Sequence, residues 1–127
     1  MLPRYSLALM LSVMLFPFAG RCAGADDARA VLAVSGVRGG LVVHLGCGDG
    51  ELTVALRAGE QYLVHGLDAD ATDVAKARER VRAAKLYGPV SVAELAGERL
   101  PYAGNLVNLL VVSEAGKVAE AEMMRVL

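Results

Sequence analysis

From residue 26 to the C-terminus, short apolar runs alternate with amphipathic stretches. Four apolar runs predict β-strands at 41–45, 62–67, 90–93 and 106–112. Apolar residues at three- and four-residue spacing predict helices at 26–37, 51–58, 70–86 and 115–126. Strands that are apolar on both faces and alternate with crossover helices form parallel sheets. The pattern therefore predicts an α/β fold, a parallel sheet with helices on both faces.

The stretch 70–86 carries the clearest helical pattern. Asp70 and Asp73 favour its N-terminus, and Gly88-Pro89 is expected to end it. Its predicted apolar face consists of Val74, Ala77, Val81 and Ala84. The opposite face carries mostly basic side chains, which are expected to be solvated because this is the usual surface of an amphipathic helix. The last helix is expected to turn Val118, Met123 and Val126 inward.

Residues 1–25 have the pattern of a secretory signal peptide. Arg4 supplies the positive charge, 7–18 the apolar run, and Ala23-Gly24-Ala25 an A-x-A cleavage site. The apolar run is shorter than the roughly 20 residues of a membrane-spanning helix. We therefore expect cleavage and export to the periplasm or the extracellular space, with no stable membrane span afterwards. An uncleaved N-terminal membrane anchor is the alternative.

Composition narrows the possible partners. The net charge of the 127 residues is −1, and removing 1–25 takes away Arg4 and Arg21, so nothing indicates nucleic-acid binding. Cleavage also removes Cys22 and leaves Cys47 as the only thiol, which excludes an internal disulfide. The two histidines lack the spacing of metal ligands, so no metal site is predicted. Residues 26–127 are expected to form one domain.

A glycine-rich segment, Gly46-Cys47-Gly48-Asp49-Gly50, joins the first predicted strand to the following helix. Glycine allows a sharp turn and lets a ligand approach the backbone at a helix N-terminus. Asp68 follows 22 residues after Gly46 at the end of the next strand, where a carboxylate can accept both hydroxyls of a ribose. A dinucleotide fingerprint would need glycine at Glu51, which disfavours an NAD-dependent oxidoreductase. A glycine-rich turn without a ligand is the other alternative.

Four segments together resemble class I S-adenosylmethionine-dependent methyltransferases. Residues 42–50 resemble motif I, and His65-Gly66-Leu67-Asp68 resembles the acidic strand end that holds the ribose. Leu100-Pro101-Tyr102 with 106–112, and the terminal 123–127, resemble two later segments of the family. The resemblance spans 27–127 and implies S-adenosylmethionine as cofactor. It also implies a truncated Rossmann-like, doubly wound sheet of about four strands in the order 3-2-1-4.

The resemblance implies roles for matching residues. Gly46, Gly48 and Gly50 would form the loop beneath the methionine part of the cofactor, with Cys47 as a small filler, and Asp68 would bind the ribose. A reactive thiol at Cys47 is the alternative. His44 stands where the family has a carboxylate that orients the methionine end, so it is expected either to hydrogen-bond there or to be a packed strand residue. The predicted cofactor-binding set is His44, Gly46, Cys47, Gly48, Gly50 and Asp68.

Other family positions also differ in this chain. Ala96 stands where many members have an acidic residue that reaches the adenine amine, and Glu94 or Glu98 would have to replace it. No catalytic residue can be assigned. Glu114 is the only ionisable group at the end of the last predicted strand, and a solvated surface role is expected for it.

The sequence thus predicts an S-adenosylmethionine-binding, methyltransferase-like domain and does not indicate the methyl acceptor. A non-catalytic, degenerate Rossmann module of an exported protein is the alternative, so enzymatic activity stays open. The family pattern continues into further strands beyond position 127, so we expect a fragment of a longer protein that carries further domains. The run 106–112 would then be an apolar edge strand.

Overall fold

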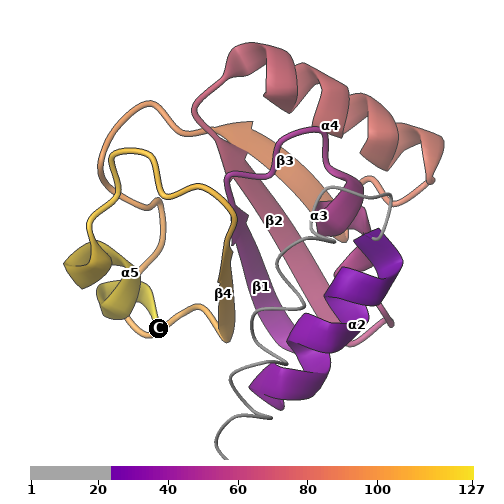
Figure 1. Ribbon diagram of the computed structural model, residues 1–127, viewed down its shortest axis with the longest axis horizontal. Coiled ribbons are helices and arrows are strands. Elements are labelled where there is room, and N and C mark those ends of the chain that lie inside the picture. The colour runs from indigo at the N-terminus through magenta and orange to yellow at the C-terminus, as the bar shows by residue number, and fades with distance from the viewer. Residues whose placement is uncertain (1–23) are drawn as a thin grey trace, which may run out of the picture.

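The computed structural model describes residues 24–127 (Figure 1). The signal peptide predicted for 1–25 therefore lies almost entirely outside the described residues. Among the described helices, none has the length and apolar character needed to cross a membrane. The elements in chain order are α2 Gly24–Ser35, β1 Gly40–Leu45, α3 Glu51–Ala55, β2 Tyr62–Asp68, α4 Ala71–Ala83, β3 Val90–Glu94, β4 Leu109–Val112 and α5 Glu120–Val126.

The four strands form one parallel sheet. Their order is β3-β2-β1-β4, as the resemblance implied. Leu45 at the end of β1 pairs with Leu67 of β2 and with Val112 of β4, and Asp68 pairs with Glu94 of β3. Because all strands are parallel and in this register, their carboxyl ends meet at one edge of the sheet. Ligands of open α/β sheets bind at this edge.

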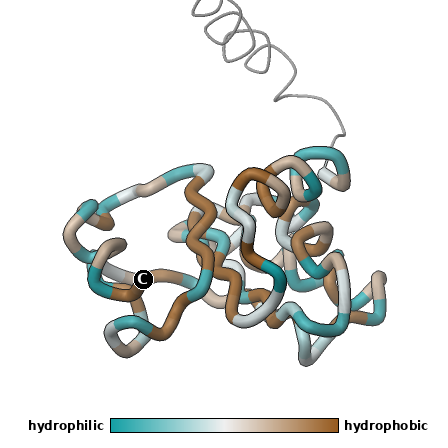
Figure 2. The backbone as a smooth tube through the Cα atoms, turned by 90° about the horizontal axis from the view of Figure 1, so that it is seen from below, coloured by the Kyte–Doolittle hydropathy of each residue, from teal (hydrophilic) through white to brown (hydrophobic). Residues whose placement is uncertain are grey.

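Hydrophobic side chains form a core on each face of the sheet. Helices α2, α3 and α4 cover one face, where Val42 and Val64 pack against Val74 and Ala77 of α4. On the other face, α5 and the irregular segment 95–107 cover Val43, Leu45 and Leu67. Figure 2 shows the hydrophobic strand segments running through the middle of the molecule, with hydrophilic loops outside. The prediction of helices on both faces is confirmed, although the two covers are unequal.

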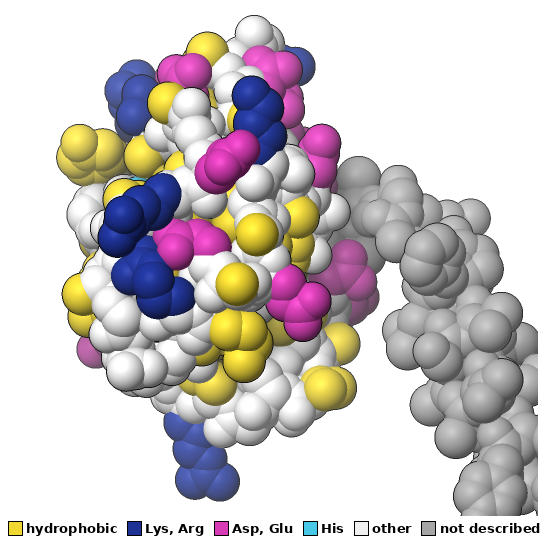
Figure 3. Space-filling model, turned by 90° about the vertical axis from the view of Figure 1, so that its left-hand side faces the viewer, with side chains coloured by type: hydrophobic (Ala, Val, Ile, Leu, Met, Phe, Trp, Pro, Cys, Tyr) yellow, Lys and Arg dark blue, Asp and Glu magenta, His cyan; other side chains and the backbone are white. Residues whose placement is uncertain are grey.

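Polar contacts join the segment 95–107 to α5. Glu122 accepts two hydrogen bonds from the Arg125 guanidinium, at 2.6 and 2.9 Å, and a third from the Leu100 backbone N–H at 2.7 Å. Arg125 in turn donates to the Leu100 carbonyl. The arginine contact and the backbone donor lower the pKa of Glu122 to about 2. Buried Leu100 is thereby held against the sheet. Figure 3 shows that basic and acidic side chains alternate on the side of the molecule where α5 lies.

Two element boundaries differ clearly from the prediction. Strand β4 begins at Leu109 rather than at 106, because the backbone before it is engaged elsewhere. Asn108 bonds to Leu41 through both its N–H and its side-chain oxygen, and the Val107 N–H donates to Val126. Helix α5 begins at Glu120 rather than at 115. Residues 114–119 form a loop instead, with Gly116 at a positive φ of 58°.

Smaller corrections concern helix ends and the core. Helix α3 ends at Ala55 and α4 at Ala83, each three residues before the predicted end. Lys85 has a positive φ of 60°, so the α4 segment leaves the helical conformation there, and Ala84 is exposed rather than buried. Strand β4 forms an edge of the sheet, and Val112 at its end is 43% exposed. The predicted apolar edge is therefore present, in a shorter strand.

Candidate functional site

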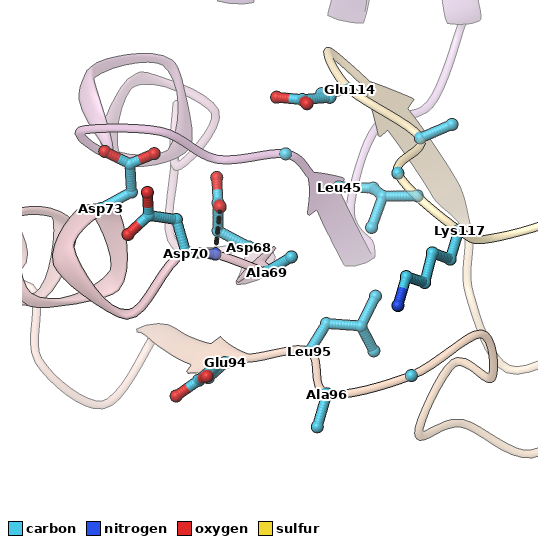
Figure 4. A pocket seen from close by; sticks show the side chains of 14 residues that line it. Leu45, Asp68, Ala69, Asp70, Asp73, Glu94, Leu95, Ala96, Glu114 and Lys117 are labelled. Atoms are coloured by element: carbon cyan, nitrogen blue, oxygen red, sulfur yellow. Dashed lines mark hydrogen bonds between the residues drawn. The ribbon is translucent and has the colours of Figure 1, made fainter.

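A cavity of about 550 Å³ opens at the carboxyl edge of the sheet (Figure 4). All four strand ends contribute to its wall. Its lining residues are Leu45 and Gly46 after β1, Asp68, Ala69, Asp70 and Asp73 after β2, Glu94, Leu95, Ala96 and Gly97 after β3, and Glu114, Ala115, Gly116 and Lys117 after β4. Ligand-binding clefts commonly have this size and this location in α/β folds.

The three glycines of the 46–50 loop all have positive φ, but they meet different surroundings. A Cβ on Gly46 would lie 2.5 Å from the backbone nitrogen of Glu114, and a Cβ on Gly50 would lie 2.9 Å from Ala77 of α4. A Cβ on Gly48 would meet nothing within 4 Å. The missing side chain of Gly46 therefore allows the loop after β4 to approach closely, and that of Gly50 allows α4 to do so. Gly46 lines the cavity, whereas Gly48 and Gly50 do not.

Asp68 ends β2 and is only 8% exposed, yet it lines the cavity. Its Oδ2 accepts the Gly48 N–H and its Oδ1 accepts the Asp70 N–H, each at 2.9 Å, the second of which is the dashed line in Figure 4. Each carboxylate oxygen has two acceptor sites, so each retains one for a ligand hydroxyl. The structure thus brings Asp68 together with the glycine loop. Its binding of a ribose stays a prediction.

His44 lies in the core rather than at the cavity. It is 2% exposed, and its ring nitrogens are hydrogen-bonded to Thr53 Oγ1 and Ser113 Oγ, each at 2.7 Å. Burial lowers its pKa to about 4, against the opposing effect of Asp68, so the ring is neutral near pH 7. Since both nitrogens are engaged, the ring offers no free polar atom to a ligand. This geometry agrees with His44 as a packed strand residue rather than as a hydrogen-bonding partner of the cofactor.

Cys47 is also buried, with 4% exposure. Burial, assisted by the negative charge of Asp68, raises the pKa of its thiol to about 12. Nucleophilic cysteines react as thiolates, so a thiol protonated at neutral pH and out of solvent is unreactive. The side chain packs beside Gly66, where an added Cβ would approach Cys47 to 3.1 Å. The structure therefore agrees with Cys47 as a filler and not with the reactive alternative.

The buried His44 leads to a prediction for stability against pH. The unfolded chain takes up a proton near pH 6.5, whereas the folded chain does so only near pH 4. Stability from the neutral ring is therefore present above pH 6.5 and is lost as the pH falls to about 4, by roughly 3 kcal/mol. The difference in urea-unfolding free energy between pH 7 and pH 4 should be smaller in His44→Gln than in the wild type. Equal differences would contradict the prediction.

The charge of the cavity is strongly unbalanced. Five carboxylates line it: Asp68, Asp70, Asp73, Glu94 and Glu114. One positively charged side chain, Lys117, lies among them (Figure 4). Of the two residues expected to replace an acid at Ala96, Glu94 lines the cavity and Glu98 does not. Such a wall favours a positively charged ligand.

Three charged residues of the cavity wall, Asp70, Asp73 and Lys117, have no site role in the sequence prediction, and exposed Glu114 lines the cavity in addition to its expected solvated position. The sequence pattern predicts Asp70 and Asp73 only as residues of a helix N-terminus, a role that Asp70 does have, because its side chain accepts the Thr72 N–H. The predicted helix at 115–126 includes Lys117. Their position two and five residues after the ribose-type Asp68 was the available signal for Asp70 and Asp73. For Lys117 no local signal exists, because its exposure depends on where α5 begins.

Comparisons with known proteins agree with this architecture. A family model described as a methyltransferase domain matches residues 42–127. No curated protein matches the chain. Among solved structures, a candidate S-adenosyl-L-methionine-dependent methyltransferase from Methanococcus maripaludis aligns over 84% of this chain and 51% of its own, with 19% identity and a TM-score of 0.73.

Two further structures show the same fold. An S-adenosylmethionine-dependent methyltransferase from Aquifex aeolicus has 24% identity and a TM-score of 0.69, and covers 91% of this chain and 65% of its own. A geranyl diphosphate methyltransferase in complex with S-adenosylmethionine has 21% identity and a TM-score of 0.70, and covers 81% and 44%. The chain thus spans 44% to 65% of the length of these structures. It belongs to the methyltransferase-domain family, with the Rossmann-like fold of class I S-adenosylmethionine-dependent methyltransferases.

Proposed function

We propose that the cavity at the carboxyl edge of the sheet binds S-adenosylmethionine, and that the domain is the cofactor-binding part of a methyltransferase. The observation that carries the proposal is the arrangement of Asp68, which lines the cavity beside the glycine loop and keeps a free acceptor site on each oxygen. Membership of the methyltransferase-domain family supports the same cofactor.

The residues of the cavity fit this cofactor. Asp68 would accept the ribose hydroxyls, and Glu94 at the end of β3 would accept the adenine amine. The backbone of Gly46, which lines the cavity, would lie beneath the methionine part. The sulfonium and the ammonium group of S-adenosylmethionine are both positively charged, and the five lining carboxylates provide the complementary field.

When bound, S-adenosylmethionine supplies a methyl group on a positively charged sulfur. The work of the chain is then to orient the cofactor and to exclude water from one side of it, because methyl transfer depends mainly on positioning of the reactants. We assign no general base. Glu114, the ionisable side chain next to Gly46, contributes negative charge to the cavity wall in this proposal.

Titration calorimetry of the full chain tests the proposal. We expect S-adenosylmethionine and S-adenosylhomocysteine to bind with micromolar dissociation constants. NAD is the control and should not bind, since Glu51 replaces the third glycine of the dinucleotide fingerprint. Circular dichroism must first show that the protein is folded. A folded protein that binds neither S-adenosylmethionine nor S-adenosylhomocysteine would overturn the proposal and favour a non-catalytic scaffold.

A further inference from the structure

His44 joins three parts of the fold that are distant in sequence. Its own backbone is in the middle of the sheet, where it pairs with Gly66 of β2 and Val111 of β4. Its ring bonds to Thr53 of α3, nine residues away, and to Ser113 just after β4, 69 residues away. Thr53 is fully buried, so this hydroxyl is satisfied only inside the protein. One side chain therefore ties the first helix after the glycine loop to the end of the edge strand.

The residues after Ser113 form part of the cavity wall. The Ser113 N–H donates to the Leu45 carbonyl at 2.9 Å, and Glu114 lies so close to Gly46 that a Cβ there would approach its backbone oxygen to 2.8 Å. The following residues, 114–117, all line the cavity. Among residues 24–127, one side-chain hydrogen bond is made to the segment 113–117, and it comes from His44. The wall is therefore held by backbone hydrogen bonds to Leu45 and, through a side chain, by His44.

Resting on the proposed function, we propose that His44 is a positioning residue for the cofactor cavity. Through Ser113 it holds the segment 113–117 against Gly46 before a ligand arrives, while its other nitrogen satisfies the buried Thr53 hydroxyl. His44 itself touches no ligand in this arrangement. Preorganisation of a site in this way raises affinity because ordering no longer has to accompany binding.

The chemistry of imidazole suits this role. A neutral ring has one N–H donor and one bare nitrogen acceptor, and each hydroxyl can donate or accept, so both bonds form in either tautomer. The two nitrogens also point in different directions in the plane of the ring, which lets one side chain contact both Thr53 and Ser113. An aspartate carboxylate at this position would be shorter. Its oxygens would reach only as far as the ring nitrogen that contacts Thr53.

Two amide substitutions separate the bonds. In His44→Asn the amide reaches the position of Nδ1 and keeps the contact with Thr53, but it stops short of Ser113. In His44→Gln the amide reaches the position of Nε2 and keeps the contact with Ser113 instead. We expect His44→Asn to weaken S-adenosylhomocysteine binding about tenfold and His44→Gln by less than about threefold. A purely structural role would make the two variants bind equally.

Ser113→Ala provides an independent test, because Ser113 is exposed and its substitution removes the bond without changing His44 itself. It should weaken binding about tenfold in the wild type and have no further effect in His44→Asn, as expected for two residues that act through one bond. Ser35→Ala is the matched control, since Ser35 is also an exposed, hydrogen-bonded serine, at the end of α2, where its hydroxyl donates to the Leu32 carbonyl and accepts the Val37 N–H. It should leave binding unchanged. Additive effects of Ser113→Ala and His44→Asn would overturn the proposal.

Amide hydrogen exchange tests the same role without a ligand. In the ligand-free chain, the amides of 113–117 should exchange faster in His44→Asn and in Ser113→Ala than in the wild type, and at the wild-type rate in His44→Gln. Equal exchange in the Asn and Gln variants would overturn the positioning role. Absence of S-adenosylhomocysteine binding in the wild type would instead overturn the proposed function, so the two failures are distinguishable.

Discussion

Asp68→Ala is expected to weaken S-adenosylhomocysteine binding at least about 100-fold. In the proposed complex the carboxylate accepts two ribose hydroxyls, and hydrogen bonds to a charged group contribute roughly 1.5–3 kcal/mol each. A 100-fold loss corresponds to about 2.7 kcal/mol, the low end for two such bonds. The variant also leaves the Gly48 and Asp70 N–H groups without their acceptor, so the glycine loop loses a contact that shapes it.

Calorimetry of three variants checks this prediction. Asp68→Asn keeps one acceptor oxygen but loses the charge, and should fall between the wild type and Asp68→Ala. Glu79→Gln is the control for removal of one negative charge, because Glu79 lies exposed on α4 and, among residues 24–127, forms an ion pair with Arg82 alone. It should bind as the wild type does. Binding by Asp68→Ala within about threefold of the wild type would show that the ribose is held elsewhere, or that the cavity binds a different ligand.

Gly50→Ala is expected to lower the free energy of unfolding by about 3 kcal/mol. Gly50 has a φ of 85°, where a residue with a Cβ is strained by roughly 1–2 kcal/mol. The new methyl would also lie 2.9 Å from both Cα and Cβ of Ala77. Ala77 is fully buried in α4, so its backbone can move only if the helix moves with it. Overpacking of this kind costs typically 1–3 kcal/mol.

Gly48→Ala is the matched control for the glycine loop. Gly48 also has a positive φ, 56°, but an added Cβ would meet nothing within 4 Å. Its substitution should therefore cost only the backbone strain, about 1 kcal/mol. Urea unfolding of the three proteins measures the difference, which isolates the contact between the loop and α4. Equal losses for the two variants would mean that α4 does not pack on Gly50 in solution.

Several features of the fold follow from local sequence. Four apolar runs separated by amphipathic stretches are sufficient to predict a parallel α/β sheet, because burial on both faces requires apolar residues throughout a strand. The glycine loop and Asp68 were identified because special backbone conformations and a carboxylate at a strand end each leave a local signature. The strand order came from the resemblance to a family. The predicted sheet, its order and the position of the glycine loop are confirmed.

Other features depend on contacts between distant residues. The periodicity of 115–126 predicts one helix, yet Gly116 turns with positive φ and residues 114–117 become cavity wall. The apolar run 106–112 predicts one strand, yet Val107 and Asn108 bond to Val126 and Leu41 instead of extending β4. In both cases the backbone hydrogen bonds go to partners that propensity cannot locate.

His44 combines a position that local sequence specifies with contacts that only the tertiary structure decides. Its place in an apolar strand next to the glycine loop is clear from sequence, and both a ligand contact and a packed position were consistent with that place. The partners that separate these interpretations, Thr53 and Ser113, are nine and 69 residues away and come together only when α3 and β4 pack on β1. Local sequence specifies which residues form strands, turns and the glycine loop, because these depend on neighbours along the chain. The partners of a buried polar group depend on the packed fold, since a buried donor or acceptor must be satisfied by whatever lies beside it.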